Sequence, residues 1–179
     1  MKGILCTGLI IMSLISIAYG YTGFGICNFG KEQVDQVICY GPTVLKDTII
    51  LQEVKVAGPL KADNVTMGSM MVTGTVNIAH STIKGAAELT GTLNAEQVNF
   101  KQGLSVVSEQ VVLNHSVIIG PFKINSQHQT PYVDLNCGTK VAGPIIFDGI
   151  MGVVRKTEDS MVEGKIKNGK MENSNKKCD

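Results

Sequence analysis

The sequence predicts an all-β protein, a single-stranded parallel β-solenoid with turns of about 17 residues. Three observations predict it: a short phrase with a central glycine recurs at a regular spacing, apolar and polar residues alternate around each glycine, and the composition is aliphatic. The chain has 20 glycines, no tryptophan and only 5% aromatic residues. Valine, isoleucine, leucine, methionine and alanine must therefore fill the core.

The recurring phrase places an apolar residue two positions before a glycine and another two positions after it. Its glycines at positions 41, 58, 74 and 91 are spaced by 17, 16 and 17 residues, and Gly120 and Gly143 follow after gaps of 29 and 23. Val106-Val107-Ser108 fits a turn that lacks its glycine. The clear copies are Val56-Ala57-Gly58-Pro59-Leu60, Val72-Thr73-Gly74-Thr75-Val76, Leu89-Thr90-Gly91-Thr92-Leu93, Ile118-Ile119-Gly120-Pro121-Phe122 and Val141-Ala142-Gly143-Pro144-Ile145. Cys39–Thr43 and Val162–Ile166 are fainter copies.

Alternation around each glycine identifies the repeating unit as a strand. Val72, Gly74, Val76 and Ile78 alternate with polar residues, and period-two alternation over four to eight residues is typical of a half-buried strand. One such turn cannot bury its apolar side alone, whereas stacked turns form a common core. We expect the glycine to mark a bend. The alternative is an antiparallel β-sandwich, whose hairpins favour Asn-Gly or Asp-Gly turns.

The Val-x-Gly-Thr-Val phrases over residues 54–105 resemble those of the bactofilin-type β-helices, small bacterial proteins that polymerise end to end. The resemblance implies a short-rung β-helix and self-association. Similar phrases also occur in secreted adhesin-like repeat proteins, which fit a predicted export signal better.

The two ends of the chain differ from the repeat block. Residues 1–20 are predicted to be a cleaved signal peptide, because a basic start precedes an apolar run from Ile4 to Ala18 and small residues at the cleavage site. Residues 21–40 are expected to form an N-terminal cap, and 41–154 the solenoid. Twelve of the 25 residues in 155–179 are charged, which predicts a disordered tail. The faint Val162-x-Gly164-x-Ile166 copy allows the alternative of a polar terminal turn. No later apolar run is long enough to span a membrane.

Four cysteines follow the predicted cleavage site, and export makes them disulfide candidates: Cys27, Cys39, Cys137 and Cys178. Four cysteines allow three connectivities. We favour the local pair Cys27–Cys39, because the two flank a short loop.

Catalytic and cofactor motifs are missing from the sequence. No nucleophile elbow, nucleotide-binding glycine pattern or zinc-type cysteine spacing occurs, so no cofactor or metal is expected. His80 and His115 lie about two turns apart, too far to share a metal ion. The alternative is a secreted enzyme with its site in residues 124–140, which contain His128, Tyr132, Asp134 and Cys137; there Cys137 would be the nucleophile and His128 its base.

These observations predict an exported, non-catalytic structural or surface-interaction protein in the periplasm, the cell envelope or the medium. The net charge of +1 argues against nucleic-acid binding. We expect a protein or glycan surface as partner, with an end-to-end polymerising scaffold as a further alternative. The expected interaction face is polar and consists of Thr73, Thr75, Asn77, Thr90, Thr92 and Asn94.

Overall fold

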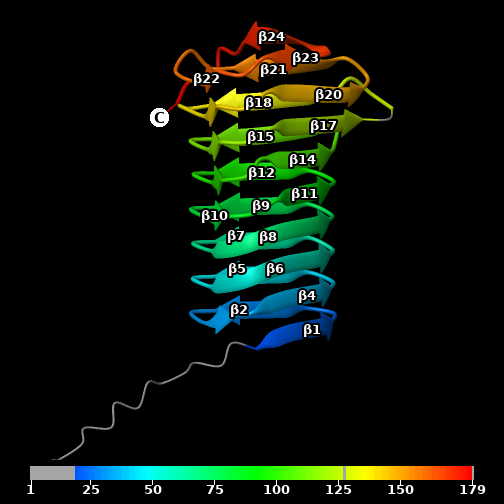
Figure 1. The fold of residues 1–179 in the computed structure, drawn as a ribbon, viewed down its shortest axis with the longest axis vertical. Helices are drawn as coiled ribbons and strands as arrows, with labels where there is room; N and C mark the ends of the chain where they lie inside the picture. Colours follow the sequence, from blue (N-terminus) through cyan, green and yellow to red (C-terminus); the bar gives the residue numbers. More distant parts are fainter. Residues whose placement is uncertain (1–18, 127, 179) are drawn as a thin grey trace, which may run out of the picture.

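The computed structural model describes residues 19–126 and 128–178, which form a β-solenoid (Figure 1). Its nine-stranded sheet contributes one strand to each turn, so the solenoid has nine turns. All strand pairs in the described residues are parallel, which confirms the predicted fold and excludes the antiparallel sandwich. The predicted signal peptide lies outside the described residues, apart from Tyr19 and Gly20.

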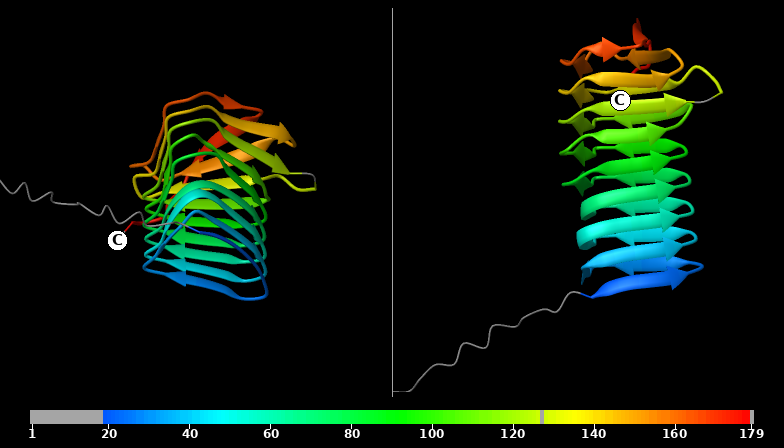
Figure 2. Two further views of the ribbon diagram at one scale, coloured as in Figure 1. Left: turned by 60° about the horizontal axis from the view of Figure 1, so that its bottom comes forward. Right: turned by 45° about the vertical axis from the view of Figure 1, so that its right-hand side comes forward.

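Each of the first eight turns contains three straight segments, the ninth contains only β23 and β24, and the turns stack directly on one another (Figure 2). A long-face strand comes first, a strand of the nine-stranded sheet second, and a short-face strand third. The strands of the nine-stranded sheet are β2 (Cys27–Gly30), β5 (Thr43–Lys46), β7 (Leu60–Asp63), β9 (Val76–Ala79), β12 (Leu93–Glu96), β15 (Gln110–Asn114), β18 (Tyr132–Asn136), β21 (Gly152–Lys156) and β24 (Gly169–Asn173).

The long and short faces are joined into one 15-stranded sheet, because β6 (Ile49–Ala57) and β8 (Thr66–Thr73) run across both. The other long-face strands are β1 (Gly20–Phe24), β4 (Gln36–Tyr40), β11 (Ala87–Thr90), β14 (Leu104–Val107), β17 (Phe122–Ser126), β20 (Ile145–Gly149) and β23 (Ile166–Lys167). The other short-face strands are β3 (Gln33–Val34), β10 (Thr82–Ile83), β13 (Asn99–Phe100), β16 (Val117–Ile118), β19 (Lys140–Val141) and β22 (Met161–Val162).

The core consists of columns of apolar side chains that run along the solenoid axis. Parallel register places Leu60, Val76 and Leu93 above one another in the nine-stranded sheet, and all three are at most 1% exposed. Each side chain therefore packs against equivalent residues one turn away on both sides. Burial of such a side chain stabilises the fold by about 1.5–3 kcal/mol. This stabilisation is present only when neighbouring turns stack.

Two separate rows of glycine, not one, mark corners of the solenoid. Gly25, Gly41, Gly58, Gly74 and Gly91 lie between the long face and the nine-stranded sheet, where each has a positive φ; we call this the glycine corner. Gly120, Gly143 and Gly164 lie instead where the short face meets the long face. The irregular gap of 29 residues in the sequence arises because the phrase moves from one corner to the other.

Close approach of neighbouring turns requires glycine at four positions of the glycine corner: Gly41, Gly58, Gly74 and Gly91. A Cβ atom on Gly58 would lie 2.6 Å from the carbonyl carbon and oxygen of Gly41 in the turn before. Gly58 also has a φ of 148°, in a region that side chains rarely adopt. The predicted bend is therefore confirmed. Ser108 occupies this corner in the sixth turn, between β14 and β15, as a turn without its glycine.

The third corner, between the nine-stranded sheet and the short face, has a left-handed residue in most turns. Lys31, Asp47, Asn64, His80, Gln97, His115 and Cys137 have φ between 47° and 55°. We call it the left-handed corner. After five of these residues the next residue is buried: Thr48, Val65, Ser81, Val98 and Ser116. The hydroxyls among them bond backbone groups. Ser81 accepts a hydrogen bond from the Val65 N–H of the turn before, at 3.0 Å, and donates one to the Ala79 carbonyl.

Both ends of the solenoid differ from the sequence prediction. The segment predicted as a separate cap, residues 21–40, forms strands β1 to β4, and β1 pairs with β4 in parallel as the later turns do. The segment predicted as a disordered tail contains β22, β23 and β24, and β24 pairs with β21 along five residues. Its many charges face outward from the last turns. None of the described residues belongs to a helix capable of crossing a membrane.

Candidate functional site

Exposed apolar side chains gather at the glycine corner of the first two turns. Phe24 is 83% exposed and Ile26 is 79% exposed, while Tyr40 and Val44 are 47% and 36% exposed. We call these four residues the corner patch. Apolar side chains grouped on a surface mark interaction sites more often than isolated ones do.

Strand register brings the two aromatic rings of the corner patch together. Phe24 ends β1, Tyr40 ends β4, and the two residues are register partners. Their rings stack with centroids 5.1 Å apart and planes 16° apart. Because this separation is close to the spacing of neighbouring strands, the rings stack along the solenoid axis. Each ring therefore covers one face of the other and keeps its edge toward solvent.

A disulfide braces the corner patch from inside. Cys27 begins β2 and Cys39 lies next to Tyr40 in β4; both side chains are 1% exposed, and they are bonded to each other. The bond joins the first turn to the second across the glycine corner, and it confirms the favoured pairing. The backbone under the patch is held further by hydrogen bonds from the Gly25 N–H to the Tyr40 carbonyl and from the Cys27 N–H to the Pro42 carbonyl. The patch therefore sits on a rigid support.

The polar residues predicted as one interaction face lie on two sides of the glycine corner. Thr73 and Thr90 are register partners on the long face, whereas Asn77 and Asn94 are partners in the nine-stranded sheet and share a 3.2 Å hydrogen bond. Thr75 and Thr92 occupy the corner between them. All six are exposed. They form a polar ridge on the same corner as the patch, two turns further along the axis.

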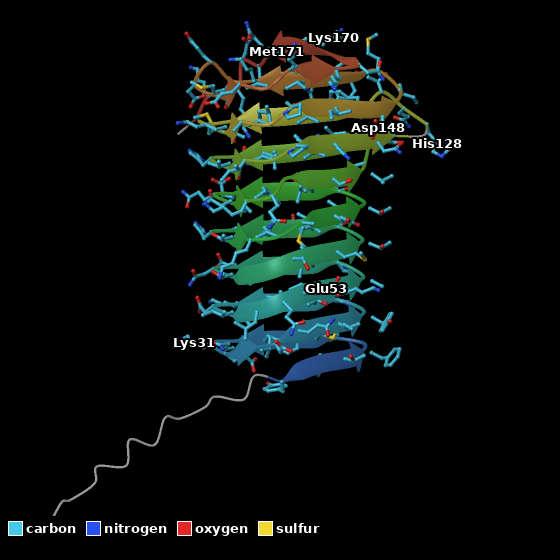
Figure 3. The ribbon with its side chains drawn as sticks, viewed as in Figure 1. Lys31, Glu53, His128, Asp148, Lys170 and Met171 are labelled. Carbon is cyan, nitrogen blue, oxygen red and sulfur yellow. A yellow bond between two sulfur atoms is a disulfide. The ribbon has the colours of Figure 1, made fainter. Side chains whose placement is uncertain are left out.

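The histidines do not form one site. His80 lies at the left-handed corner, where its Nδ1 is 2.9 Å from an oxygen of Asp63; His115, two turns on, is 2.9 Å from Glu96 in the same way. Each histidine thus contacts a carboxylate of the turn before. His128 is exposed on the loop between β17 and β18, which projects from the solenoid (Figure 3).

Residues 124–140 do not bring a nucleophile and a base together. Cys137 is bonded to Cys178, so its sulfur is not a free thiol, and this second disulfide joins the seventh turn to the end of the described chain. Asp134 accepts two hydrogen bonds from Arg155, at 2.7 and 2.9 Å. The Arg155 guanidinium also lies 4.8 Å from the ring centre of Tyr132. These charged groups satisfy one another.

A shallow groove of about 690 Å³ lies beside this cluster. Its lining includes Tyr132, Arg155, Gln110, Thr92 and Glu109. In residues 19–126 and 128–178, no three histidine, cysteine, aspartate or glutamate side chains approach closely enough to hold a metal ion. The groove thus presents a mixture of polar and apolar surface.

Sequence reasoning missed the corner patch, although its signal was present. Phe24-Gly25 and Tyr40-Gly41 place an aromatic residue before a glycine 16 residues apart, which is the repeat spacing. Taking residues 21–40 as a cap hid that spacing.

Comparison with known protein families, with curated proteins and with solved structures gave no match for the chain.

Proposed function

We propose that this protein is an exported, non-catalytic surface-interaction protein that binds another protein through its corner patch. The observation that carries the proposal is the exposure of Phe24 and Ile26, at 83% and 79%, on a disulfide-braced support. Apolar side chains that stay in water do not contribute burial free energy to the fold. A rigid apolar patch, by contrast, binds a complementary surface with little loss of conformational entropy. The bactofilin-like and adhesin-like resemblance of residues 54–105 agrees with a structural or adhesive role.

The chemistry of the patch favours a protein partner over a glycan. Glycans stack on open aromatic faces, and the mutual stacking of Phe24 and Tyr40 covers one face of each ring. The exposed ring surface that remains, together with the aliphatic side chains of Ile26 and Val44, suits a pocket of apolar side chains. The polar ridge at Thr73 and its neighbours would then form the rim that surrounds the apolar centre of many protein interfaces.

The proposal is tested by photo-crosslinking in the producing cells. A photoreactive phenylalanine analogue is placed at position 24 or 40, and as a matched control at Ser105, an exposed long-face residue several turns away. We expect protease-sensitive adducts from positions 24 and 40 and none from 105. Adducts that glycosidases remove and proteases do not would show a glycan partner instead.

A second measurement uses variants of the patch. We expect Phe24→Ser combined with Ile26→Ser to lower the fraction of protein bound to the cell surface at least tenfold, since each buried apolar anchor contributes about 1–2 kcal/mol. Ser105→Ala should leave that fraction unchanged. An unchanged bound fraction in the patch variant, with the fold intact by circular dichroism, would contradict the proposal.

A further inference from the structure

The two ends of the solenoid are finished differently. At the N-terminal end, the Tyr21 ring packs edge-on against Phe29, with centroids 4.9 Å apart, and lies across Gly23. Beneath it, Phe29 is 5% exposed and Val34 is fully buried. The aromatic ring thus closes the open cross-section of the first turn.

The C-terminal end leaves its cross-section open. Register places Met171 of β24 above the fully buried Val154, so Met171 points along the core column, yet it is 48% exposed. Val162 and Ile166 occupy the equivalent core columns of the other two faces and are also partly exposed. The apolar columns of the three faces therefore end in Met171, which is exposed, and in Val162 and Ile166, which are only partly buried against the core.

The chain beyond β24 turns away from this end. The Ser174 N–H donates to the Lys156 carbonyl, Lys176 reaches Asn114 of β15, and Cys178 is bonded to Cys137. In Figure 1 the end of the described chain accordingly lies beside β18 rather than above β24. The edges of β22, β23 and β24 remain free to pair, and unprotected sheet edges readily add another strand.

The sequence of β24 is complementary to itself in the antiparallel sense. Its residues are Gly169, Lys170, Met171, Glu172 and Asn173, so a charged residue flanks Met171 on each side. Figure 3 shows Lys170 and Met171 at the C-terminal end of the solenoid. Two copies related by a two-fold axis at Met171 would place each Lys170 opposite the other copy's Glu172. Opposite charges directly across a strand pair are favourable. Within one chain the Lys170 ammonium already lies 2.6 Å from the Glu172 carboxylate, so the two groups are close enough to exchange partners.

From this geometry we infer that two copies of the chain associate tail to tail, pairing β24 with β24 in antiparallel register around Met171. The same two-fold axis exchanges the other faces and brings Val162 of one copy toward Ile166 of the other. A two-fold contact of this kind is closed. Tyr21 packs over the core at the opposite end, so that end lacks a matching exposed apolar column, and we expect association to stop at a dimer and not to continue into a filament.

The test is the mass of the purified, fully oxidised protein across a concentration series, measured by analytical ultracentrifugation. We expect a reversible change from monomer to dimer and no larger species. Glu172→Lys places two lysines opposite each other and should weaken the dimer at least tenfold. Adding Lys170→Glu to that variant reverses both charges and should restore the dimer. Lys55→Glu, on the long face, is the control and should change nothing.

Proximity at the two-fold axis gives an independent readout. Met171→Cys should form a disulfide-linked dimer rapidly on mild oxidation, whereas Lys123→Cys on the long face should not. A monomer at every concentration, growth beyond a dimer, or failure of the double charge reversal to restore association would each overturn the inference. Unchanged melting temperatures of the charge variants show that the fold is not the cause.

Discussion

Replacing Ser81 by alanine isolates the contribution of the hydroxyls at the left-handed corner. The Ser81 hydroxyl lies 3.0 Å from the Val65 nitrogen, and Ser81 and Val65 are 2% and 1% exposed. No other acceptor for the Val65 N–H exists in the described residues. The substitution therefore leaves a donor buried and unpaired, and it removes the hydrogen bond to the Ala79 carbonyl. An unsatisfied buried group costs about 1–3 kcal/mol, so the free energy of unfolding should fall by that amount.

Two assays follow this change. Urea unfolding gives the loss of free energy, and hydrogen exchange of the Val65 amide reports the site directly, with the amides of neighbouring turns as internal references. Ser105→Ala is the matched control, because Ser105 is exposed and should alter stability by less than about 0.5 kcal/mol. If Ser81→Ala costs no more than Ser105→Ala, or if the Val65 amide keeps its protection, the hydroxyl does not satisfy that group.

Three further substitutions test the core, the glycine corner and one charged group. Val76→Asp should lower the free energy of unfolding by more than about 3 kcal/mol, because Val76 is fully buried. Thr75→Asp, at the exposed neighbouring position, should lower it little. Equal losses in urea unfolding would contradict the assignment of Val76 to the core and of Thr75 to the surface. Gly74→Ala should cost at least about 1–3 kcal/mol by thermal unfolding, since Gly74 has a φ of 148° and contacts the backbone of the turn before. A hydrogen bond from the Thr157 hydroxyl lowers the pKa of Asp159. Ionised Asp159 therefore stabilises the fold at neutral pH, and this contribution is lost as the pH falls through the lowered pKa. The difference in free energy of unfolding between wild type and Asp159→Asn should be present at pH 7 and vanish in acid.

The solenoid could be predicted because its evidence is local. Val72, Gly74 and Val76 show the alternation within one turn, and the 17-residue spacing repeats it. The position of Gly120 could not be predicted in the same way, because a glycine looks alike at either corner and only the backbone shows which segments it joins. The composition of residues 155–173 led to the wrong prediction of a disordered tail, because outward-facing charges on a terminal turn resemble those of a disordered segment.

The candidate site was less visible in the sequence than the fold. The predicted Thr73 and Asn77 positions are exposed as expected, but a bend between them places them on different sheets. The exposure of Phe24 could not be inferred from its residue type, because aromatic residues are usually buried. The structure shows it, because Phe24 ends β1 with 83% of its surface exposed in the part of the chain that is described.

The disulfide between Cys137 and Cys178 has a mechanical consequence. Tension applied to the peptide bond after Cys178 reaches the solenoid at Cys137, because the covalent link is shorter than the intervening chain. The two cysteines are 41 positions apart in the sequence. The disulfide therefore prevents the segment between them, about 140 Å long when fully extended, from being pulled out. The last two turns therefore carry no load while the bond is intact. Under pulling, the protein should yield first at turns that precede the seventh, and the terminal turns should stay folded until a reductant opens the link.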